Sequence, residues 1–95
     1  MRNYIPRKGK EYNNGKLIYE GEYLNGEKNG KGKEYDDGNL IFEGEYLNGK
    51  RNGKGKEYNY KGEIIFEGEF LNGTKWNGKG KGKEYNDGEL IFERE

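Results

Sequence analysis

The sequence predicts an all-β protein: an elongated, twisted, single-layer antiparallel meander of about eight short strands built from β-hairpin repeats. Three observations predict it. Glycine and aromatic residues recur at regular positions, short segments alternate between apolar and polar residues, and Asn-Gly or Asp-Gly pairs separate these segments. Parallel pairing needs long crossover connections, and the chain has none, so neighbouring strands are expected to run antiparallel.

The meander is expected to form one array, because the chain writes the same unit several times. Half a unit occupies residues 7–18, full units occupy 19–41, 42–65 and 66–91, and the start of another occupies 92–95. The second full unit has one extra residue near Tyr60, and the third has three extra in "TKWNGKGKG". The glycine-rich stretches therefore belong to a structural repeat.

Each full unit is predicted to contain two strands and two tight turns. The first strand is "LIFEGEY", residues 40–46 in the second unit. One face should carry Leu40, Phe42, Gly44 and Tyr46, and the other should carry Ile41, Glu43 and Glu45. The connections "LNGKRNG" and "YDDGN" hold Asn-Gly and Asp-Gly, which tolerate the positive φ of hairpin turns.

The second strand is "GKGKEY", residues 53–58. Its two sides should carry Gly53, Gly55 and Glu57, and Lys54, Lys56 and Tyr58. We expect Glu43 and Glu45 to lie opposite Lys56 and Lys54, with Tyr46 and Gly44 against Gly53 and Gly55. Aromatic rings of one strand would then cover the bare glycine backbone of the next strand.

Composition limits the function classes. Among 95 residues, 38% are charged and 28% hydrophobic, but 15% are aromatic, which favours an ordered chain with a thin core over a disordered one. Lys plus Arg equals Asp plus Glu, 18 against 18, so no nucleic-acid partner is expected. The chain has no cysteine and no apolar stretch long enough for a signal or a membrane span. A cytoplasmic location is the default expectation.

Candidate chemical motifs find structural explanations. The run "GKGKGKEY" (78–85) lacks the Ser or Thr and the following helix of a phosphate-binding loop. "YDDGN" and "YNDGE" have too few carboxylates for a calcium loop. Paired glutamates such as Glu43 and Glu45 repeat in identical surroundings, whereas catalytic pairs need distinct ones. Without His, Cys or Ser, the chain is not expected to be an enzyme, and we expect no metal or cofactor.

The units resemble MORN repeats (membrane occupation and recognition nexus) in their order of aromatic, Gly, aromatic, Asn-Gly, Gly-x-Gly, aromatic and Gly. The first unit carries it through Tyr19, Gly21, Tyr23, Asn25, Gly26, Gly30, Gly32, Tyr35 and Gly38. The second uses Phe42, Gly44, Tyr46, Asn48, Gly49, Gly53, Gly55, Tyr58 and Gly62, and the third uses Phe66, Gly68, Phe70, Asn72, Gly73, Gly78, Gly80 or Gly82, Tyr85 and Gly88. Asn29, Asn52 and Asn77 stand where the family often has His. The resemblance implies a single-layer scaffold or protein-interaction module without enzymatic activity.

The leading hypothesis is a scaffold that binds protein through its aromatic–glycine face or through its edge strands. The candidate anchors are Tyr23, Phe42, Tyr46, Phe66, Phe70 and Trp76. Trp76, the one tryptophan, lies in the loop that breaks the repeat; the alternative is that its indole covers apolar surface of the sheet. We call strands like "LIFEGEY" first-type and strands like "GKGKEY" second-type. The chain starts with a second-type strand and finishes with a first-type strand, so copies could pair end to end, unless Pro6 and neighbouring charges block the edges.

The second hypothesis is peripheral binding to anionic phospholipid through repeated lysine pairs. These are Lys31, Lys33, Lys54, Lys56, Lys79, Lys81 and Lys83. The neutral net charge and the interleaved glutamates weigh against it. A third interpretation is an array, fragment or design, with no partner of its own.

Overall fold

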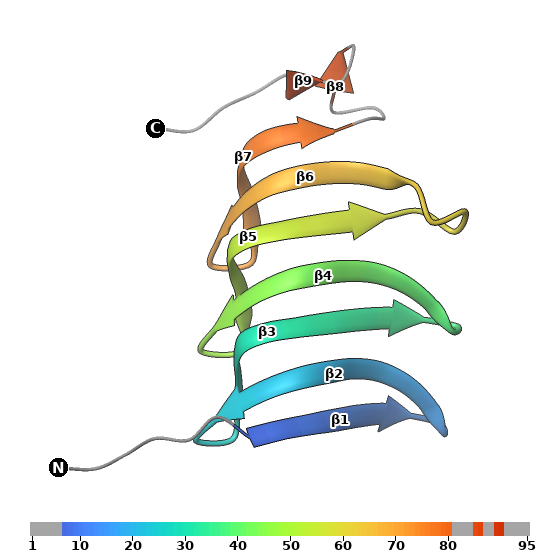
Figure 1. Cartoon of the computed structure of the whole chain (residues 1–95), viewed down its shortest axis with the longest axis vertical. Coiled ribbons are helices and arrows are strands. Elements are labelled where there is room, and N and C mark those ends of the chain that lie inside the picture. Colours follow the sequence, from blue (N-terminus) through green and yellow to red (C-terminus); the bar gives the residue numbers. More distant parts are fainter. Residues whose placement is uncertain (1–6, 81–84, 87–88, 91–95) are drawn as a thin grey trace, which may run out of the picture.

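The computed structural model describes residues 7–80, 85–86 and 89–90, which form one open antiparallel sheet (Figure 1). The strands are β1 (Arg7–Asn13), β2 (Lys16–Leu24), β3 (Glu27–Asp36), β4 (Asn39–Leu47), β5 (Lys50–Tyr58), β6 (Ile64–Leu71), β7 (Thr74–Gly80), β8 (Tyr85–Asn86) and β9 (Glu89–Leu90). From β1 to β7 each strand pairs with the next in the chain, and β9 and then β8 follow β7. The predicted fold class, an all-β antiparallel meander, is confirmed.

Two-residue turns join most of these strands. Asn48 and Gly49 have φ values of 52° and 83°, and the described turns at residues 14–15, 25–26, 37–38 and 72–73 have similar positive angles at both residues. Positive φ at both central residues defines a type I′ turn, whose twist suits a hairpin. The connection between β5 and β6 is longer, and there the side chain of Asn59 accepts hydrogen bonds from the N–H groups of Lys61 and Glu63.

The glycines at the middle of the strands pair with one another from β1 to β7. The column consists of Gly9, Gly21, Gly32, Gly44, Gly55, Gly68 and Gly78. Beside it Glu43 pairs with Lys56, as predicted. The register between a strand of the "LIFEGEY" type and its neighbour is therefore defined by glycine opposite glycine, with glutamate opposite lysine at the next position.

The predicted pairing of Glu45 with Lys54 is wrong, because a bulge interrupts β4 and β5 between Gly44 and Tyr46. Tyr46 lies opposite Arg51, and Gly53 pairs instead with Phe70 on the other side of β5. The bulge forms because Gly53 adopts a φ of 104°, which favours glycine. The same irregularity recurs between β2 and β3, where Gly30 has a φ of 92°.

A second bulge, between β3 and β4, inserts Ile41. Glu34 lies opposite Phe42, but the next pair is Tyr35 with Leu40. Residues paired across two strands face the same side of a sheet, so the simple alternation that grouped Leu40 with Phe42 does not continue through the bulge.

The bulges after the Asn-Gly turns bend the sheet. Figure 1 shows β5 and β7 turning sharply near their starts. The bent segments of successive units are linked, since the N–H of Gly49 donates to the carbonyl of Lys28 at 3.0 Å and that of Gly73 to the carbonyl of Arg51 at 2.8 Å. This bend allows a single layer to enclose a core.

Candidate functional site

Four of the six aromatic residues that the sequence marked as binding anchors, Phe42, Tyr46, Phe66 and Phe70, form the core of the protein, and Tyr23 packs against it. Neighbouring rings meet edge to face, with centroids 5.2–5.7 Å apart. In spatial order the aromatic row is Tyr23, Tyr19, Tyr46, Phe42, Phe70 and Phe66. The exposed fraction is 0% for Phe42 and Phe66, and 4% for Tyr46 and Phe70. These rings contact the chain's own residues, so their use by a partner stays a prediction that their burial disfavours.

Tyr19 and Trp76 lie in places that the sequence did not predict. Tyr19 is 1% exposed and central to the core, although the sequence hypothesis left it out of the anchors. Trp76 lies within β7, half-buried, and not in the loop that was predicted there. Tyr19 could have been found from the sequence, because it occupies the same place in its unit as Phe42 and Phe66.

Basic side chains cover the outer side of the aromatic row. The Nζ atoms of Lys28 and Lys75 lie 4.5 Å and 5.2 Å from the ring centroids of Tyr19 and Phe66, and the Arg51 guanidinium carbon lies 4.0 Å from that of Phe42. Such cation–π contacts stabilise by roughly 0.5–2 kcal/mol each. Sequence reasoning missed them, although each basic residue stands two places after the glycine of an Asn-Gly turn.

Arg51 is held in place by two carboxylates. Its Nη2 lies 2.9 Å from Oε1 of Glu34 and its Nη1 lies 2.8 Å from Oε2 of Glu57. The hydroxyl of Tyr46 also donates to Glu34. Burial by itself would raise the pKa of Glu34, but the hydrogen bonds from Arg51 and Tyr46 lower it below its ordinary value. The aromatic face is thus closed by an ionic layer of the protein's own residues.

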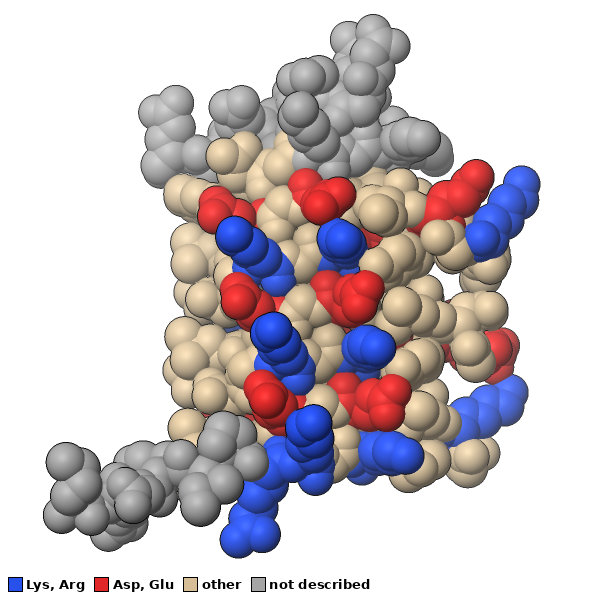
Figure 2. Space-filling model, viewed as in Figure 1, with Lys and Arg blue, Asp and Glu red and all other residues tan. Residues whose placement is uncertain are grey.

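The opposite face of the sheet carries a groove of about 1360 Å³ that crosses the strands. Its floor is the bare backbone of the glycine column, from Gly9 in β1 to Gly68 in β6. Two rows of charged side chains form its sides (Figure 2). One row is Lys8, Glu22, Lys31, Glu45, Lys54 and Glu69; the other is Lys10, Glu20, Lys33, Glu43, Lys56 and Glu67. We call this surface the Lys–Glu groove.

Both rows alternate in the same phase, because odd-numbered strands supply lysine and even-numbered strands supply glutamate. Figure 2 shows the result as blue and red side chains that follow each other along two columns. A step of one strand, about 4.8 Å, therefore reverses the charge on both sides of the groove. A step of two strands restores it.

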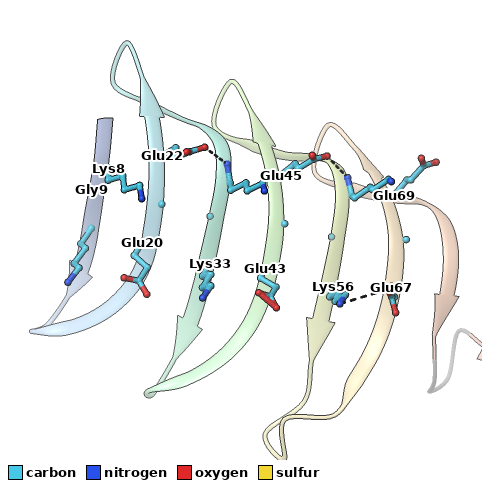
Figure 3. Close-up of a pocket in the computed structure, with 18 residues that line it drawn as sticks. Lys8, Gly9, Glu20, Glu22, Lys33, Glu43, Glu45, Lys56, Glu67 and Glu69 are labelled. Atoms are coloured by element: carbon cyan, nitrogen blue, oxygen red, sulfur yellow. Dashed lines mark hydrogen bonds and ion pairs between the residues drawn. The ribbon is translucent and has the colours of Figure 1, made fainter. Parts of the chain in front are cut away.

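Four of the six glutamates that line the groove are fixed by hydrogen bonds (Figure 3). Glu22 and Glu45 each accept a hydrogen bond of 2.8 Å from a backbone N–H, of Lys31 and Lys54 respectively. Glu20 accepts one of 2.6 Å from the hydroxyl of Tyr35. Glu43 accepts the corresponding bond from Tyr58, also 2.6 Å. The carboxylates are therefore positioned before any partner arrives.

These hydrogen bonds also shift the two tyrosines. Burial, followed by the hydrogen bond to Glu20, raises the pKa of Tyr35 to about 12. Burial and the bond to Glu43 raise the pKa of Tyr58 to about 12 in the same way. Both hydroxyls consequently stay protonated over the physiological range, and both remain donors to the groove carboxylates.

The lysines of the groove are less constrained. Lys56 lies 3.9 Å from Glu67, a distance at the outer limit of an ion pair between exposed groups. Within the described residues, the ammonium groups of Lys31, Lys33 and Lys54 form no ion pair. These ammonium groups can therefore reach a ligand that enters the groove.

The lysines proposed for lipid binding divide between described and undescribed parts of the chain. Lys31, Lys33, Lys54 and Lys56 lie in the Lys–Glu groove, each next to glutamates of adjacent strands. Lys79 lies in β7, paired with Glu67 and Glu89. Lys81 and Lys83 lie outside the described residues. The groove thus presents mixed charge and no uniformly basic surface.

The described residues contain no group of His, Cys, Asp and Glu that could hold a metal ion. They also contain no helix long and apolar enough to cross a membrane. What the groove offers chemically is a set of fixed carboxylate acceptors and lysine ammonium groups on either side of a floor of glycine backbone. This arrangement can hold a polar, extended ligand by hydrogen bonds and ion pairs.

The MORN repeat profile matches residues 19–40 and 42–63. Each matched segment contains a strand with the aromatic-Glu-Gly-Glu sequence, the Asn-Gly turn and the following glycine–lysine strand. No curated protein and no solved structure matches the chain.

Proposed function

Because the chain carries MORN repeats at residues 19–40 and 42–63, we propose that it is a non-enzymatic protein-interaction module whose binding surface is the Lys–Glu groove. One observation supports this surface above the others. Two rows of charged side chains, in one phase, border a floor of glycine backbone over six consecutive strands. The aromatic row, by comparison, is buried.

The groove suits an extended polypeptide. The column glycines lie at positions that face the aromatic side of the sheet, so no side chain rises from the floor between the two charged rows and the main chain of a partner can lie there. Lysines recur along each row at every second strand, about 9.6 Å apart, and an extended chain rises about 3.3 Å per residue. Acidic residues at every third position of a partner would therefore meet successive lysines, with basic residues between them to meet the glutamates.

A periodic peptide tests this proposal. We expect a labelled (Glu-Lys-Gly)4 peptide to bind the full chain more tightly than a peptide of the same composition with Glu, Lys and Gly in separate blocks. Fluorescence anisotropy at low and physiological salt would measure both affinities. Equal affinity for the two peptides, or no binding of either, would contradict the groove as a peptide site.

The chain offers a matched pair of variants for the same measurement. Lys31→Glu combined with Lys54→Glu places two like charges against the acidic positions of the peptide and should weaken binding about fivefold or more, since exposed pairs contribute up to about 1 kcal/mol each. Lys50→Glu combined with Lys61→Glu makes the same change of net charge at exposed positions outside the groove. That control should bind as the parent does.

Binding to anionic phospholipid remains the alternative prediction. The interleaved Glu20, Glu22, Glu43 and Glu45 oppose it, because they bring negative charge to the surface that the lysines would use. Flotation with phosphoinositide-containing vesicles at low and physiological salt would decide. Salt-sensitive flotation would favour the lipid role, and absence of the protein from the vesicle fraction at both salt concentrations would dismiss it.

Self-association through the edge strands and a cytoplasmic location also remain predictions. The last strand of the proposed end-to-end contact was predicted at residues 90–95, of which 91–95 lie outside the described residues. Light scattering after size-exclusion chromatography over a hundredfold range of concentration would test self-association. A mass that rises with concentration would support end-to-end pairing, and a constant monomer would oppose it.

A further inference from the structure

In the described part of the chain, β1 has a neighbouring strand on one edge only, whereas other strands of its type have one on each edge. The second-type strands β3 and β5 each lie between two first-type strands. β1 has the same type of sequence and pairs with β2 as β3 pairs with β4: Lys8 with Glu22, Gly9 with Gly21 and Lys10 with Glu20. Within the described residues, no strand pairs with the other edge of β1.

Tyr12 shows what this edge lacks. Its equivalents, Tyr35 and Tyr58, are half-buried and donate hydrogen bonds to the first glutamate of the preceding first-type strand, Glu20 or Glu43. Tyr12 is 58% exposed, and in the described part of the chain its hydroxyl has no hydrogen-bond partner. A donor is therefore in position with no acceptor in front of it.

On the aromatic side of the same strand, Gly9 is covered by fewer rings than its equivalent in β5. A Cβ atom at Gly55 would meet two rings, Phe42 of the preceding strand and Phe70 of the following strand, and Gly55 is buried. A Cβ at Gly9 would meet only Tyr23 of the following strand, and Gly9 is partly exposed. The ring that would come from a preceding strand is absent over Gly9.

We propose that the open edge of β1 is a binding site for one extended segment of sequence aromatic-Glu-Gly-Glu, supplied by another protein chain. The segment would add to the sheet as an antiparallel strand. This site is separate from the Lys–Glu groove and does not depend on peptide binding there.

The internal repeat fixes the register of the added strand. β2 pairs with β3 through Tyr19 opposite Glu34, Glu20 opposite Lys33 and Gly21 opposite Gly32. By the same rule, the aromatic residue of the partner lies opposite Glu11, its first glutamate opposite Lys10 and its glycine opposite Gly9. The partner's ring then covers Gly9, and its first glutamate accepts the hydrogen bond of Tyr12.

The glycine of the segment is required by the close approach of the backbones. A Cβ at Gly21 would lie 2.5 Å from the carbonyl oxygen of Lys31 and 2.5 Å from Cα of Gly32 in the following strand. Residues Phe92-Glu93-Arg94-Glu95 carry Arg94 in place of this glycine and therefore do not match the segment.

Three peptides test the site. The first has the sequence of residues 16–25, KLIYEGEYLN, and the others carry Ala or Arg in place of its glycine. We expect the glycine peptide to bind the full chain with a dissociation constant below about 100 µM. The alanine peptide, which has the same charge, should bind at least about tenfold more weakly because overpacking is costly. Fluorescence anisotropy would measure all three.

Variants of the protein locate the binding. Tyr12→Phe should weaken binding of the glycine peptide about fivefold or more, because the peptide's carboxylate loses its hydrogen-bond donor. Tyr60→Phe, at a 79% exposed ring in the loop before β6, should not. The Lys31→Glu, Lys54→Glu groove variant should bind this peptide normally even if it no longer binds the periodic peptide. Circular dichroism would confirm that each variant keeps the parent fold.

Four results would overturn the proposal, and three of them concern the peptides and the tyrosine variants. These are no binding of the glycine peptide at 100-micromolar concentrations, equal binding of the glycine and alanine peptides, and equal loss of binding in Tyr12→Phe and Tyr60→Phe. Loss of binding in the groove variant alone would also overturn it, since the peptide would then occupy the Lys–Glu groove. If the periodic peptide does not bind the Lys–Glu groove, the proposal for the β1 edge still stands, because it concerns a different site.

Discussion

At the scale of single residues, the closest contacts of the sheet are made by glycine backbone. A Cβ atom at Gly44 would lie 2.5 Å from the carbonyl oxygen of Lys54, 2.6 Å from Cα of Gly55 and 2.8 Å from Cζ of Phe42. The first two of these neighbours are backbone atoms of a paired strand, which cannot move without breaking the pairing. Glycine at this position is therefore a packing requirement.

Replacing Gly44 tests that requirement. We expect Gly44→Ala to lower the free energy of unfolding by about 2–3 kcal/mol, because it overpacks the contact between β4 and β5. Gly38→Ala is the matched control, since Gly38 has a φ of 82° but open space around it. It should lose only about 1 kcal/mol of backbone strain. Urea unfolding would measure both, and equal losses would contradict the packing account.

Glu34 makes stability depend on acid pH. The pKa of Glu34 is lowered in the folded protein, so its contribution is complete above the ordinary value of 4.5 and is lost as pH falls through the lower, folded value. We expect the unfolding free energy to decrease below about pH 4.5. Glu34→Gln should make this decrease smaller, whereas Glu27→Gln at an exposed site should not change it. Urea unfolding between pH 3 and pH 7 would show whether the two slopes differ, and identical slopes would contradict the role of Glu34.

At the scale of elements, the hairpin turns depend on a residue that accepts positive φ before glycine. Asn48 has a φ of 52°. We expect Asn48→Ala to destabilise the protein by about 1 kcal/mol, because an alanine side chain disfavours this left-handed conformation. Asn48→Gly should be close to neutral. Thermal unfolding would compare the two, and an alanine variant as stable as the glycine variant would show that the turn does not limit stability.

The strands, the turns and the glycine column could be predicted from the sequence because each follows from local pattern. Gly44 opposite Gly55 and Glu43 opposite Lys56 needed only the alternation of two strands joined by a short turn. The bulges could not be predicted in this way. They depend on the positive φ of Gly53 and on the hydrogen bond from the Lys54 N–H to Glu45, and neither has a distinct signal inside a glycine–lysine run.

The missed bulges also explain why the candidate anchors are buried. A flat sheet would leave Phe42 and Tyr46 on an open face, where a partner could reach them. The bend near Gly53 brings Arg51 over the Phe42 ring and closes that face. The surface that remains open is the one with Lys54 and Lys56, which the sequence had marked only for lipid.

At the scale of the whole molecule, each strand pairs only with its neighbours in the sheet. Such quasi-one-dimensional arrays open more readily at their ends than in the middle. We expect backbone amides of β3 to β5 to exchange with deuterium more slowly than those of β1, by about tenfold or more. Hydrogen exchange followed by NMR or mass spectrometry would test this, and uniform protection would indicate that the sheet unfolds as one unit.

The in-phase alternation of lysine and glutamate strands gives the groove translational symmetry. A ligand shifted by two strands, about 9.6 Å, meets the same charges again, whereas a shift by one strand sets like charges against each other. A ligand in the groove would therefore have several equivalent binding registers, separated by energy barriers and related by shifts of two strands. A long periodic ligand can bind in more of these registers than a short one, and this multiplicity raises its affinity without any additional contact.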